Sequence, residues 1–509
     1  MSLRQKRAAI SVREMLPDSQ FFGDRDVRVS SCTSDPKRCR RGGLFVAVQT
    51  PESDGHDRVG EAVRRGAAAV IAERHLAVRA PLYLVPDSRE AYGRICHRLA
   101  DLPSRHLCTV GITGTNGKTT TSLLIASVLR AAGCPTGMLN SLIYDDALRC
   151  EPAPQSAQPA ELARWLARMR DNGCSHAVVE ASSRALAERT TAGLELDAAV
   201  LTNMRRDHLD FHGSIINYRR AKARLFDHLK PGGFVVANAD DPATRFLLRN
   251  IEHPVLTVGM RAAAELCARV VERHAGEQTF LLTAGTETAA VQTALIGDHH
   301  VYNCLAAAAV GLVLGIDLTT VARGLEAVMW IEGRMEPIVC GQPFGVYVDH
   351  GHTPDALAMT LKTLRQVTSG RILCVFGLDT VGDPLQRAQL GRVLERGADL
   401  GVIAGGGTCW QESLKVAHDM LDGYDRPARA HLLPDRAEAV RWILSQAGPG
   451  DAVLIAGRAN RAVPAESSRD VRQAARQWLL EVGAKIDYQQ PPAPRTAVRR
   501  MAYRPPVIN

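Results

Sequence analysis

Short, continuous apolar runs separated by helical patterns recur along the whole chain and constrain its fold more than any other feature. The first three runs lie at residues 44–48, 67–72 and 82–85, with helical patterns at residues 57–65 and 89–99. Runs bounded by Gly, Pro or Asp are typical of strands, and runs without polar alternation suit parallel strands buried on both faces. The alternation therefore predicts an α/β fold.

The length of 509 residues predicts about three domains. Strand-like runs and helices alternate again in the middle and last thirds of the chain, which is a doubly wound pattern. The last residues are rich in Pro and Arg, and we expect them to be disordered. We therefore expect three α/β domains and a tail, at residues 1–104, 105–336, 337–488 and 489–509.

Composition excludes several classes of function. Hydrophobic residues make up 46% of the chain and charged residues 23%, a globular balance that rules out disorder as the main state. A net charge of +8 is mild for this length, and only 5% of residues are aromatic, so we expect no nucleic-acid partner. The longest apolar stretch, residues 304–316, is too short for membrane insertion and predicts a buried helix. Twelve cysteines without a C-x-x-C pair fit a reducing, cytoplasmic location.

The sharpest local motif is GITGTNGKTT at residues 111–120, which follows a predicted strand and opens a helix that runs to about Ala132. Glycines let backbone N–H groups approach phosphate oxygens, and a helix N-terminus adds positive potential. Lys118 would reach the β- and γ-phosphates of a nucleotide, and Thr119 would ligate Mg²⁺. The strict phosphate-loop pattern is missed by one residue, so a simple glycine-rich turn is the alternative. The combination of strand, loop, Lys-Thr and helix favours an ATP site.

Three polar residues farther along the chain are candidates for a magnesium and phosphate site, and each has a plainer interpretation. Glu180 ends a predicted strand, where open α/β sheets bind ligands, and its carboxylate would hold Mg²⁺ or make a surface ion pair. His208 follows the next strand and would either coordinate the metal or face solvent. Lys222 lies in a basic helical stretch whose ordinary interpretation is a solvated face. The residues alone leave these alternatives open.

Together these motifs resemble the Mur ligase family, and most closely its MurE-type ligases, which add the third residue of the peptidoglycan stem peptide. The similarity runs from about residue 25 to about residue 485. The segment at residues 42–56 is similar to the family's uridine-nucleotide domain. The other matching segments are GITGTNGKTTT, VVEASSRAL, TNMRRDHLDFHGSIINYRRAKARLF, IEGRME and VDHGHTPDAL, at residues 111–121, 178–186, 202–226, 331–336 and 348–357.

The resemblance implies a ligase with a central P-loop-type, mostly parallel sheet. An N-terminal α/β nucleotide-sugar domain and a C-terminal Rossmann-like domain would flank it. ATP would phosphorylate the free carboxylate of UDP-N-acetylmuramoyl-L-alanyl-D-glutamate, and the amine of an amino acid would then displace the phosphate. The expected partners are thus this UDP-linked dipeptide and an amino acid. The expected cofactors are ATP and Mg²⁺, and the chain is expected to act as a monomer in the cytoplasm.

The resemblance also assigns roles by position. Lys222 falls where the family carries a carbamylated lysine, formed when a neutral amine captures CO₂. Ser182 falls where the family contacts the UDP-linked substrate. The implied catalytic residues are Lys118, Glu180, His208 and Lys222, and the implied metal ligands are Thr119, Glu180, His208 and Lys222. The implied ATP contacts are Gly114, Thr115, Asn116, Gly117, Lys118, Thr119, Thr120, Asn303, Arg334 and Asp349.

This sequence departs from the family pattern where the family binds its substrates. Near the substrate peptide, Pro-Gln-Ser-Ala replaces Asn-Thr-Thr-Pro at residues 154–157. In the third domain, Gln386 stands where the family has a lysine. The segments at residues 405–409 and 458–461 also differ from the family pattern. Other central-domain substitutions are Arg184 for His, Glu188 for Gln, Thr190 for Arg, and His299-His300 for Phe-Asn.

Two hypotheses follow from these departures. The chain is an active ligase with an altered amino-acid preference, or it is a degenerate paralogue. The paralogue would bind ATP and Mg²⁺, would have lost or changed its ligase activity, and would act as a scaffold or regulator. The intact central motifs favour the first hypothesis. A nucleic-acid motor shares the phosphate loop, but the composition argues against its basic and aromatic surfaces.

Overall fold

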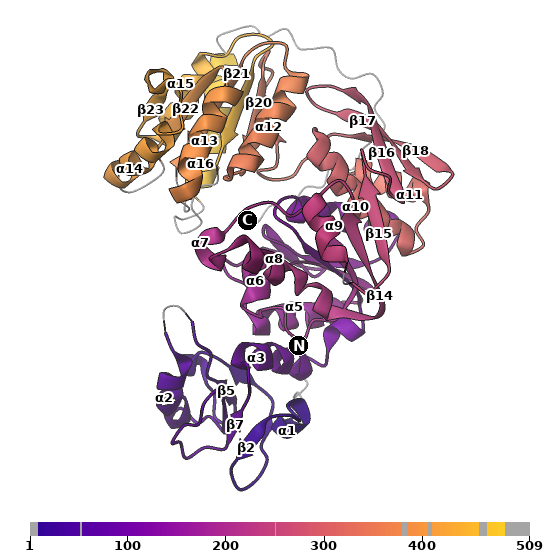
Figure 1. The fold of residues 1–509 in the computed structure, drawn as a ribbon, viewed down its shortest axis with the longest axis vertical. Coiled ribbons are helices and arrows are strands. Elements are labelled where there is room, and N and C mark those ends of the chain that lie inside the picture. Colours follow the sequence, from indigo (N-terminus) through magenta and orange to yellow (C-terminus); the bar gives the residue numbers. More distant parts are fainter. Residues whose placement is uncertain are drawn as a thin grey trace.

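The computed structural model describes residues 9–50, 53–249, 251–378, 384–405, 410–457 and 466–483. Within these residues the strands form three large sheets and one small pair, β1 (Ile10–Ser11) with β3 (Arg28–Val29). Figure 1 shows the three sheets, each with its helices, arranged one after another along the long axis of the molecule. The predicted α/β fold with mostly parallel sheets is confirmed. The tail expected at residues 489–509 lies outside the described residues.

The N-terminal sheet is built from the first apolar runs of the sequence. Its strand order is β2-β7-β6-β5-β4, and only the β2–β7 pair is antiparallel. The helix expected at residues 57–65 is shorter in the structure. Buried side chains of α3 and α5 share one core, so the sheet is joined to the central unit. The elements are β2 (Gln20–Phe22), β4 (Cys32–Thr33), β5 (Leu44–Val46), β6 (Ala69–Ala72), β7 (Leu82–Leu84), α1 (Val12–Met15), α2 (Val59–Arg64) and α3 (Ser88–Leu99).

The central sheet places β8 between β12 and β13, with all three strands parallel. An antiparallel extension, β16 to β18, forms one edge, and β10 and β11 form the other. The strands are β8 (Cys108–Thr113), β9 (Thr136–Leu139), β10 (Ile143–Asp145), β11 (Cys150–Pro152), β12 (His176–Glu180), β13 (Leu196–Leu201), β14 (Leu229–Asn238), β15 (Val255–Gly259), β16 (Leu266–Arg273), β17 (Gln278–Ala284) and β18 (Glu287–Thr293).

Eight helices accompany this sheet among the described residues. They are α4 (Lys118–Ala131), α5 (Pro159–Asp171), α6 (Ser183–Ala187), α7 (Leu209–His212), α8 (Ile215–Ala223), α9 (Pro242–Leu248), α10 (Asp298–Val313) and α11 (Leu318–Glu326). From β8 the chain first runs to β9 and β12 on one side, and later to β13 and β14 on the other. The direction of winding therefore switches at β8, and open α/β sheets bind ligands at the carboxyl ends of strands beside such a switch.

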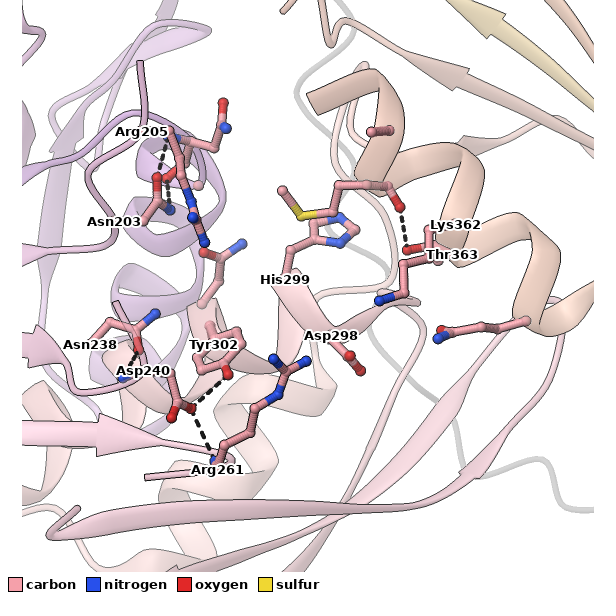
Figure 2. Close-up of a pocket in the computed structure, with 16 residues that line it drawn as sticks. Asn203, Arg205, Asn238, Asp240, Arg261, Asp298, His299, Tyr302, Lys362 and Thr363 are labelled. Atoms are coloured by element: carbon pink, nitrogen blue, oxygen red, sulfur yellow. Dashed lines mark hydrogen bonds between the residues drawn. The ribbon is translucent and has the colours of Figure 1, made fainter. Parts of the chain in front are cut away.

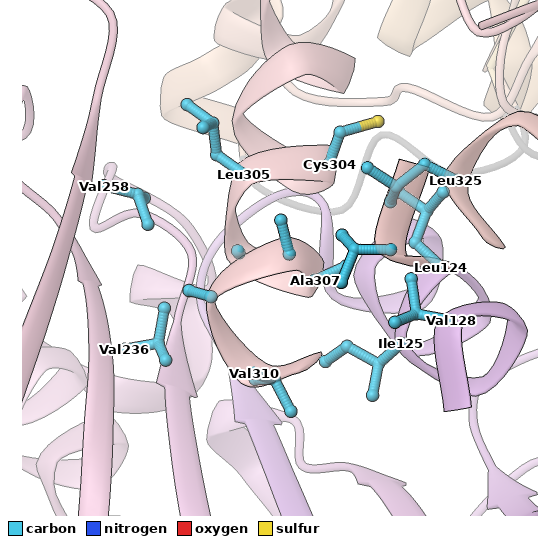
Figure 3. Close-up of a cluster of buried hydrophobic side chains, with 14 of the residues drawn as sticks. Leu124, Ile125, Val128, Val236, Val258, Cys304, Leu305, Ala307, Val310 and Leu325 are labelled. Carbon is cyan, nitrogen blue, oxygen red and sulfur yellow. The ribbon is translucent and has the colours of Figure 1, made fainter. Parts of the chain in front are cut away.

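The alanine-rich stretch of the sequence forms the buried helix α10, as predicted. Ala307 and Ala309 are fully buried, and their small side chains let α10 lie close to its neighbours. Figure 3 shows α10 with Leu124 and Val128 of α4 on one side and Val236 of β14 on the other. This packing fixes the start of α10 relative to α4, and both helix starts belong to the candidate site.

The third sheet has the strand order β19-β20-β24-β21-β22-β23 and is parallel except for the β19–β20 pair. In the described part of the chain no helix has the length and apolarity needed to cross a bilayer. The strands are β19 (Glu336–Pro337), β20 (Gly345–Asp349), β21 (Ile372–Gly377), β22 (Leu400–Ala404), β23 (His431–Leu433) and β24 (Ala452–Ala456). The helices are α12 (Pro354–Val367), α13 (Pro384–Gly397), α14 (Trp410–Leu421), α15 (Arg436–Ser445) and α16 (Glu466–Gly483).

Candidate active site

The loop between β8 and α4 leaves the first N–H groups of α4 without a side-chain cap. Gly117 is the N-cap residue with a φ of +86°, and no described side chain accepts a hydrogen bond from this helix start. In contrast, Ser182 caps α6 and Thr353 caps α12 through side-chain oxygens. The uncapped N–H groups and the helix dipole make this helix start suited to an anion such as a phosphate.

Close approach requires glycine at two loop positions. A Cβ at Gly114 would collide with the hydroxyl of Thr202, and a Cβ at Gly117 would collide with the side-chain amide of Asn303. The Asn303 side chain also accepts a hydrogen bond from Thr121 of α4 at 3.3 Å. The loop is thus held between the end of β13 and the first turns of α10.

Thr119 and Glu180 meet beside the loop. The Thr119 hydroxyl donates to Glu180 Oε2 at 2.9 Å, and the backbone N–H of Ser141 donates to the same oxygen at 3.0 Å. Ser141 Oγ lies 2.9 Å from Thr119 Oγ1, and Arg334 Nη2 donates to Thr119 Oγ1 at 3.5 Å. Glu180 makes no ion pair with any described residue, so its carboxylate belongs to the loop rather than to a surface pair.

This oxygen cluster fits a magnesium ion. A hydroxyl and a carboxylate are the hard donors that Mg²⁺ prefers, and Mg²⁺ commonly takes only one or two protein carboxylates beside substrate phosphates. Among the described residues no three His, Cys, Asp or Glu side chains gather as a metal cluster. Thr119 and Glu180 are therefore the described pair best suited to hold the ion.

Two lysines share one loop carbonyl. Lys118 Nζ donates to the carbonyl oxygens of Gly114 and Thr115 at 3.1 and 2.9 Å, and Lys222 Nζ donates to that of Gly114 at 2.6 Å. Lys222 is only 1% exposed and lies over the ring of Tyr218, 4.7 Å from its centre. The interpretation of Lys222 as part of a solvated basic face is therefore wrong, because its amine is buried beneath the loop.

Burial lowers the pKa of both amines. It is the largest cause that lowers the pKa of Lys118, while the carboxylates of Glu180 and Asp207 act in the opposite direction. Burial, followed by the charge of Lys118, holds the pKa of Lys222 well below its usual value. A lysine with a lowered pKa contains more neutral amine, which is the nucleophilic form. Lys222 is thus chemically suited to react with CO₂.

The residues after β13 form the outer support of the loop. Asn203 exchanges two hydrogen bonds with the backbone of Asn116, at 3.0 and 2.9 Å. The hydroxyl of Thr115 lies 2.8 Å from that of Tyr218 and accepts from the backbone N–H of Arg205 at 2.8 Å. These bonds hold Thr115 and Asn116 in place between β13 and α8.

His208 is not brought to the phosphate loop by any described contact. Its side chain is 54% exposed, and Nε2 lies 3.5 Å from a carboxylate oxygen of Asp207. Its φ of +50° places it in the left-handed region, at the start of α7. Asp207 is the buried member of this pair, and its charge acts on both Lys118 and Lys222. A role for His208 as a metal ligand stays a prediction.

A cavity of about 360 Å³ lies beyond the loop, between the central strand ends and α12. Figure 2 shows Asn203, Asp240 and Tyr302 on one wall and Lys362 on α12 across from them. Asp240 accepts hydrogen bonds from the Tyr302 hydroxyl at 2.7 Å and from three backbone N–H groups. Other lining residues are Asn116, Gly117, Arg205, Arg261, His299 and Asn303. Since the cavity adjoins Gly117, its position suits the base and ribose of a nucleotide whose phosphates meet the loop.

Arg334 and Asp349 lie at the connection to the third sheet. Asp349 is buried, and its carboxylate accepts from the backbone N–H groups of Met335 and Gly351 at 2.9 and 2.7 Å. Burial raises the pKa of Asp349, and the charge of Arg334 opposes that shift. Asp349 therefore holds the backbone next to Arg334, whose side chain contacts Thr119. No described hydrogen bond links Asp349 itself to the loop.

A second groove reaches Glu180 from the N-terminal side. A cavity of about 210 Å³ is lined by Ser141, Glu180 and Ser182, and a cavity of about 450 Å³ lies against Gly55 and Tyr92 of the N-terminal unit. The two cavities share part of their walls. Ser182, an exposed N-cap residue, thus lies on the path between the N-terminal sheet and Glu180.

The structure gathers most of the predicted residues around the loop. The loop residues Gly114 to Thr120 lie with Glu180, Lys222, Asn303 and Arg334, whereas Ser182 and Asp349 lie one step farther away. Sequence reasoning missed Ser141, Asp207, Tyr218, Asp240, Tyr302 and Lys362. Ser141 and Asp240 follow strand ends, which is the signal that singled out Glu180, while the others depend on tertiary packing. The changed segments at residues 406–409 and 458–461 lie outside the described residues.

Comparison with known proteins identifies the family. The chain matches the Mur ligase middle domain over residues 112–311 and the Mur ligase, glutamate ligase domain over residues 333–459. It is 37% identical over 433 residues to the UDP-N-acetylmuramoyl-L-alanyl-D-glutamate–2,6-diaminopimelate ligase of Geobacillus kaustophilus (strain HTA426), covering 83% of this chain and 88% of that protein. It is 33% identical over 488 residues to the UDP-N-acetylmuramyl-tripeptide synthetase of Roseiflexus sp. (strain RS-1), covering 89% and 95%.

A solved structure of a UDP-N-acetylmuramoyl-L-alanyl-D-glutamate–2,6-diaminopimelate ligase agrees with the fold described above. It aligns with a TM-score of 0.66 and 26% sequence identity, over 92% of this chain and 99% of that one. The resemblance noted in the sequence is thereby confirmed, and the chain belongs to the Mur ligase family.

Proposed function

We propose that this chain is an ATP-dependent ligase of peptidoglycan precursor synthesis that adds an amino acid to UDP-N-acetylmuramoyl-L-alanyl-D-glutamate. One observation carries the proposal: Glu180 accepts a hydrogen bond from Thr119 of the phosphate loop and also lines the groove that leads to the N-terminal sheet. A carboxylate at the end of this groove would meet the γ-phosphate of a nucleotide held by the loop. The Geobacillus kaustophilus relative carries this UDP-linked substrate in its name, and the Roseiflexus relative is named for synthesis of a UDP-linked tripeptide.

In this proposal, each of the three α/β units has its own role. Residues 1–104 would hold the uridine nucleotide, residues 105–336 would hold ATP and carry out the phosphoryl transfer, and residues 337–488 would present the amino acid. We propose a cytoplasmic monomer, which is the state that the family resemblance implies, and the substrates of the proposed reaction are soluble metabolites.

In the proposed nucleotide site, the phosphates of ATP lie at the uncapped start of α4. Gly114, Thr115, Asn116 and Gly117 supply the loop backbone, and Lys118 supplies charge next to the β- and γ-phosphates. Thr120 follows in the first turn. Asn303 contacts the base from α10, and Arg334 and Asp349 act from the connection to the third sheet.

Mg²⁺ would be held by Thr119 and Glu180, with His208 and a carbamylated Lys222 as further proposed ligands. The ion supplies charge neutralisation for the transferring phosphoryl group. Carbamylation joins the Lys222 amine nitrogen to the carbon of CO₂ and releases one proton, so the amine becomes a carboxylate. The lowered pKa of the Lys222 amine, caused first by burial and then by the charge of Lys118, supports this assignment.

The side chains of the site would position the reactants and would not form covalent bonds with the substrates. Lys118 and Arg334 neutralise charge on the γ-phosphate while the substrate carboxylate attacks it, which produces an acyl phosphate and ADP. The amine of the incoming amino acid then attacks the acyl carbon, the C–N bond forms and inorganic phosphate leaves. Ser182 would orient the UDP-linked substrate so that its free carboxylate reaches the loop.

A phosphate-release assay tests the proposal directly. The full chain is incubated with Mg-ATP, UDP-N-acetylmuramoyl-L-alanyl-D-glutamate and a panel of amino acids that includes diaminopimelate, and the product is identified by mass. We expect phosphate release and a tripeptide product that both depend on one class of amino acid. Phosphate release that no amino acid alters, without product, would support the degenerate paralogue instead. Lys118→Ala should abolish turnover.

A further inference from the structure

The two cavities on the N-terminal side adjoin each other, and together they are here called the groove. The smaller cavity reaches Glu180, and the larger reaches Gly55 and Tyr92 of the N-terminal unit. Five residues belong to the walls of both cavities: Ser156, Ala157, Arg184, Glu188 and Thr190. A ligand that extends from the N-terminal sheet to Glu180 must therefore pass these five side chains, and Arg184 is the cation among them.

Arg184 has donor capacity that its protein contacts do not use. Its Nε donates to Glu188 Oε1 at 2.9 Å, and its guanidinium carbon lies 5.0 Å from the ring centre of Phe211. Among the described residues no acceptor bonds to Nη1 or Nη2 of Arg184, and the side chain is 59% exposed. A guanidinium has five N–H donors in a planar fork, so the two terminal nitrogens remain for a ligand with paired oxygens.

The other two arginines that line the groove also have protein partners, and they lie away from the junction of the two cavities. Arg58 pairs with Glu61 at 3.7 Å, and Arg89 donates to the backbone carbonyl of Gln49 through Nε and Nη2. Both line only the larger cavity. Arg184 is thus the described cation that lies where the two cavities join and that keeps its terminal nitrogens open.

We infer that Arg184 binds an anionic oxygen pair of the UDP-linked substrate at the junction of the two cavities and sets the affinity for that substrate. The inference rests on the proposed function, whose substrate carries two groups of this chemistry, the diphosphate and the carboxylates of its glutamate. Both present paired oxygens that match the guanidinium fork. Glu188 keeps the guanidinium in place and at the same time opposes an anion through its own charge.

The test measures binding of three ligands by calorimetry: UDP, UDP-N-acetylmuramoyl-L-alanine, and UDP-N-acetylmuramoyl-L-alanyl-D-glutamate. The variants are Arg184→Ala and Arg184→Lys, with Arg164→Ala as the control. Arg164 is matched closely, because its side chain is also 59% exposed and also pairs with a glutamate on its own helix, yet it lines neither cavity.

We expect Arg184→Ala to weaken binding of the dipeptide ligand roughly tenfold to a hundredfold, which is the loss of one charge-assisted hydrogen bond or pair. Arg184→Lys should recover only part of this loss, and Arg164→Ala should bind like the parent. If all three ligands weaken in Arg184→Ala, the bound group is the diphosphate. If only the glutamate-containing ligand weakens, the bound group is its carboxylate.

Two other outcomes overturn the inference. Unchanged dipeptide binding by Arg184→Ala, beside a parent that binds it, removes Arg184 from substrate binding but leaves the proposed function standing. A parent that binds none of the three ligands refutes the proposed function and this inference together. Thermal denaturation of each variant, measured without ligand, confirms that a loss of binding does not reflect a loss of fold.

Discussion

Replacing Gly117 with alanine perturbs the phosphate loop at one atom, and Gly133→Ala provides a matched control on the same helix. Gly117 precedes α4 and Gly133 follows it, with φ angles of +86° and +77°. A Cβ at Gly133 meets nothing within 4 Å, whereas a Cβ at Gly117 collides with the side chain of Asn303. Both variants therefore strain the backbone equally, and only Gly117→Ala displaces a group of the nucleotide cavity.

The expected free energies follow from these contacts. Left-handed backbone costs an alanine roughly 1–2 kcal/mol, which applies to both variants. Displacement of Asn303 also breaks its hydrogen bond with Thr121, at a cost of about 1 kcal/mol. We therefore expect Gly133→Ala to lower the free energy of unfolding by roughly 1–2 kcal/mol and Gly117→Ala by roughly 2–3 kcal/mol.

Nucleotide binding should separate the two variants more clearly than stability does. Moving the loop away from a phosphate oxygen removes at least one hydrogen bond to a charged group, which contributes about 1.5–3 kcal/mol. The affinity of Gly117→Ala for Mg-ADP should thus fall roughly tenfold to a hundredfold, while Gly133→Ala should bind like the parent. Calorimetric titration with Mg-ADP measures both. Equal affinities for all three proteins would refute the placement of the phosphates at this helix start.

Three further outcomes are expected. Lys222→Met keeps the side-chain volume but removes the amine, so turnover should be lost with ADP affinity retained. The parent should gain the mass of one CO₂ in bicarbonate, measured by native mass spectrometry, and the variant should not. Arg472→Ala strips the buried Glu336 of its 3.1 Å ion pair and should lower the free energy of unfolding by roughly 3 kcal/mol, whereas Arg396→Ala, which breaks an exposed pair, should cost at most about 1 kcal/mol in denaturant titrations. Burial lowers the pKa of His97 to about 3, so the neutral ring gives its full stabilisation above pH 6.5 and loses it as the pH falls toward 3. His97→Leu should therefore reduce the stability difference between pH 7 and pH 5 by roughly 2 kcal/mol, and an unchanged difference would contradict the assignment.

Strand ends were the part of the site that sequence could predict. Parallel strands bring their carboxyl ends to one edge, so the apolar run before Glu180 made its carboxylate a candidate for the phosphate loop, with a surface ion pair as the alternative. Lys222 could not be placed in this way. The sequence of its helix predicts a basic, solvated face. Only the packing of α8 beneath Gly114 buries the amine.

The groove residues illustrate a second limit of sequence reasoning. Arg184 and Tyr92 lie 92 positions apart in the printed sequence, and they come to one groove because α3 packs on α5. No local pattern encodes that contact, which depends on how two sheets dock. The resemblance identified Arg184 as a departure from the family, but only the structure places it where two cavities join.

In the proposed function Thr119 and Glu180 lie between the two substrates, and the topology accounts for this position. The nucleotide cavity opens toward α10 and α12, and the groove opens toward α5 and α6. These lie on opposite sides of β8, the strand at which the winding of the central sheet reverses. In the proposed reaction the phosphoryl group passes from one side to the other, beside the loop that follows β8. Arg334 reaches Thr119 from the connection to the third sheet, and α12 of that sheet forms a wall of the nucleotide cavity. The connection thus contacts the loop and the third unit lines the cavity, so the proposed site would require the central and third units to keep their relative positions.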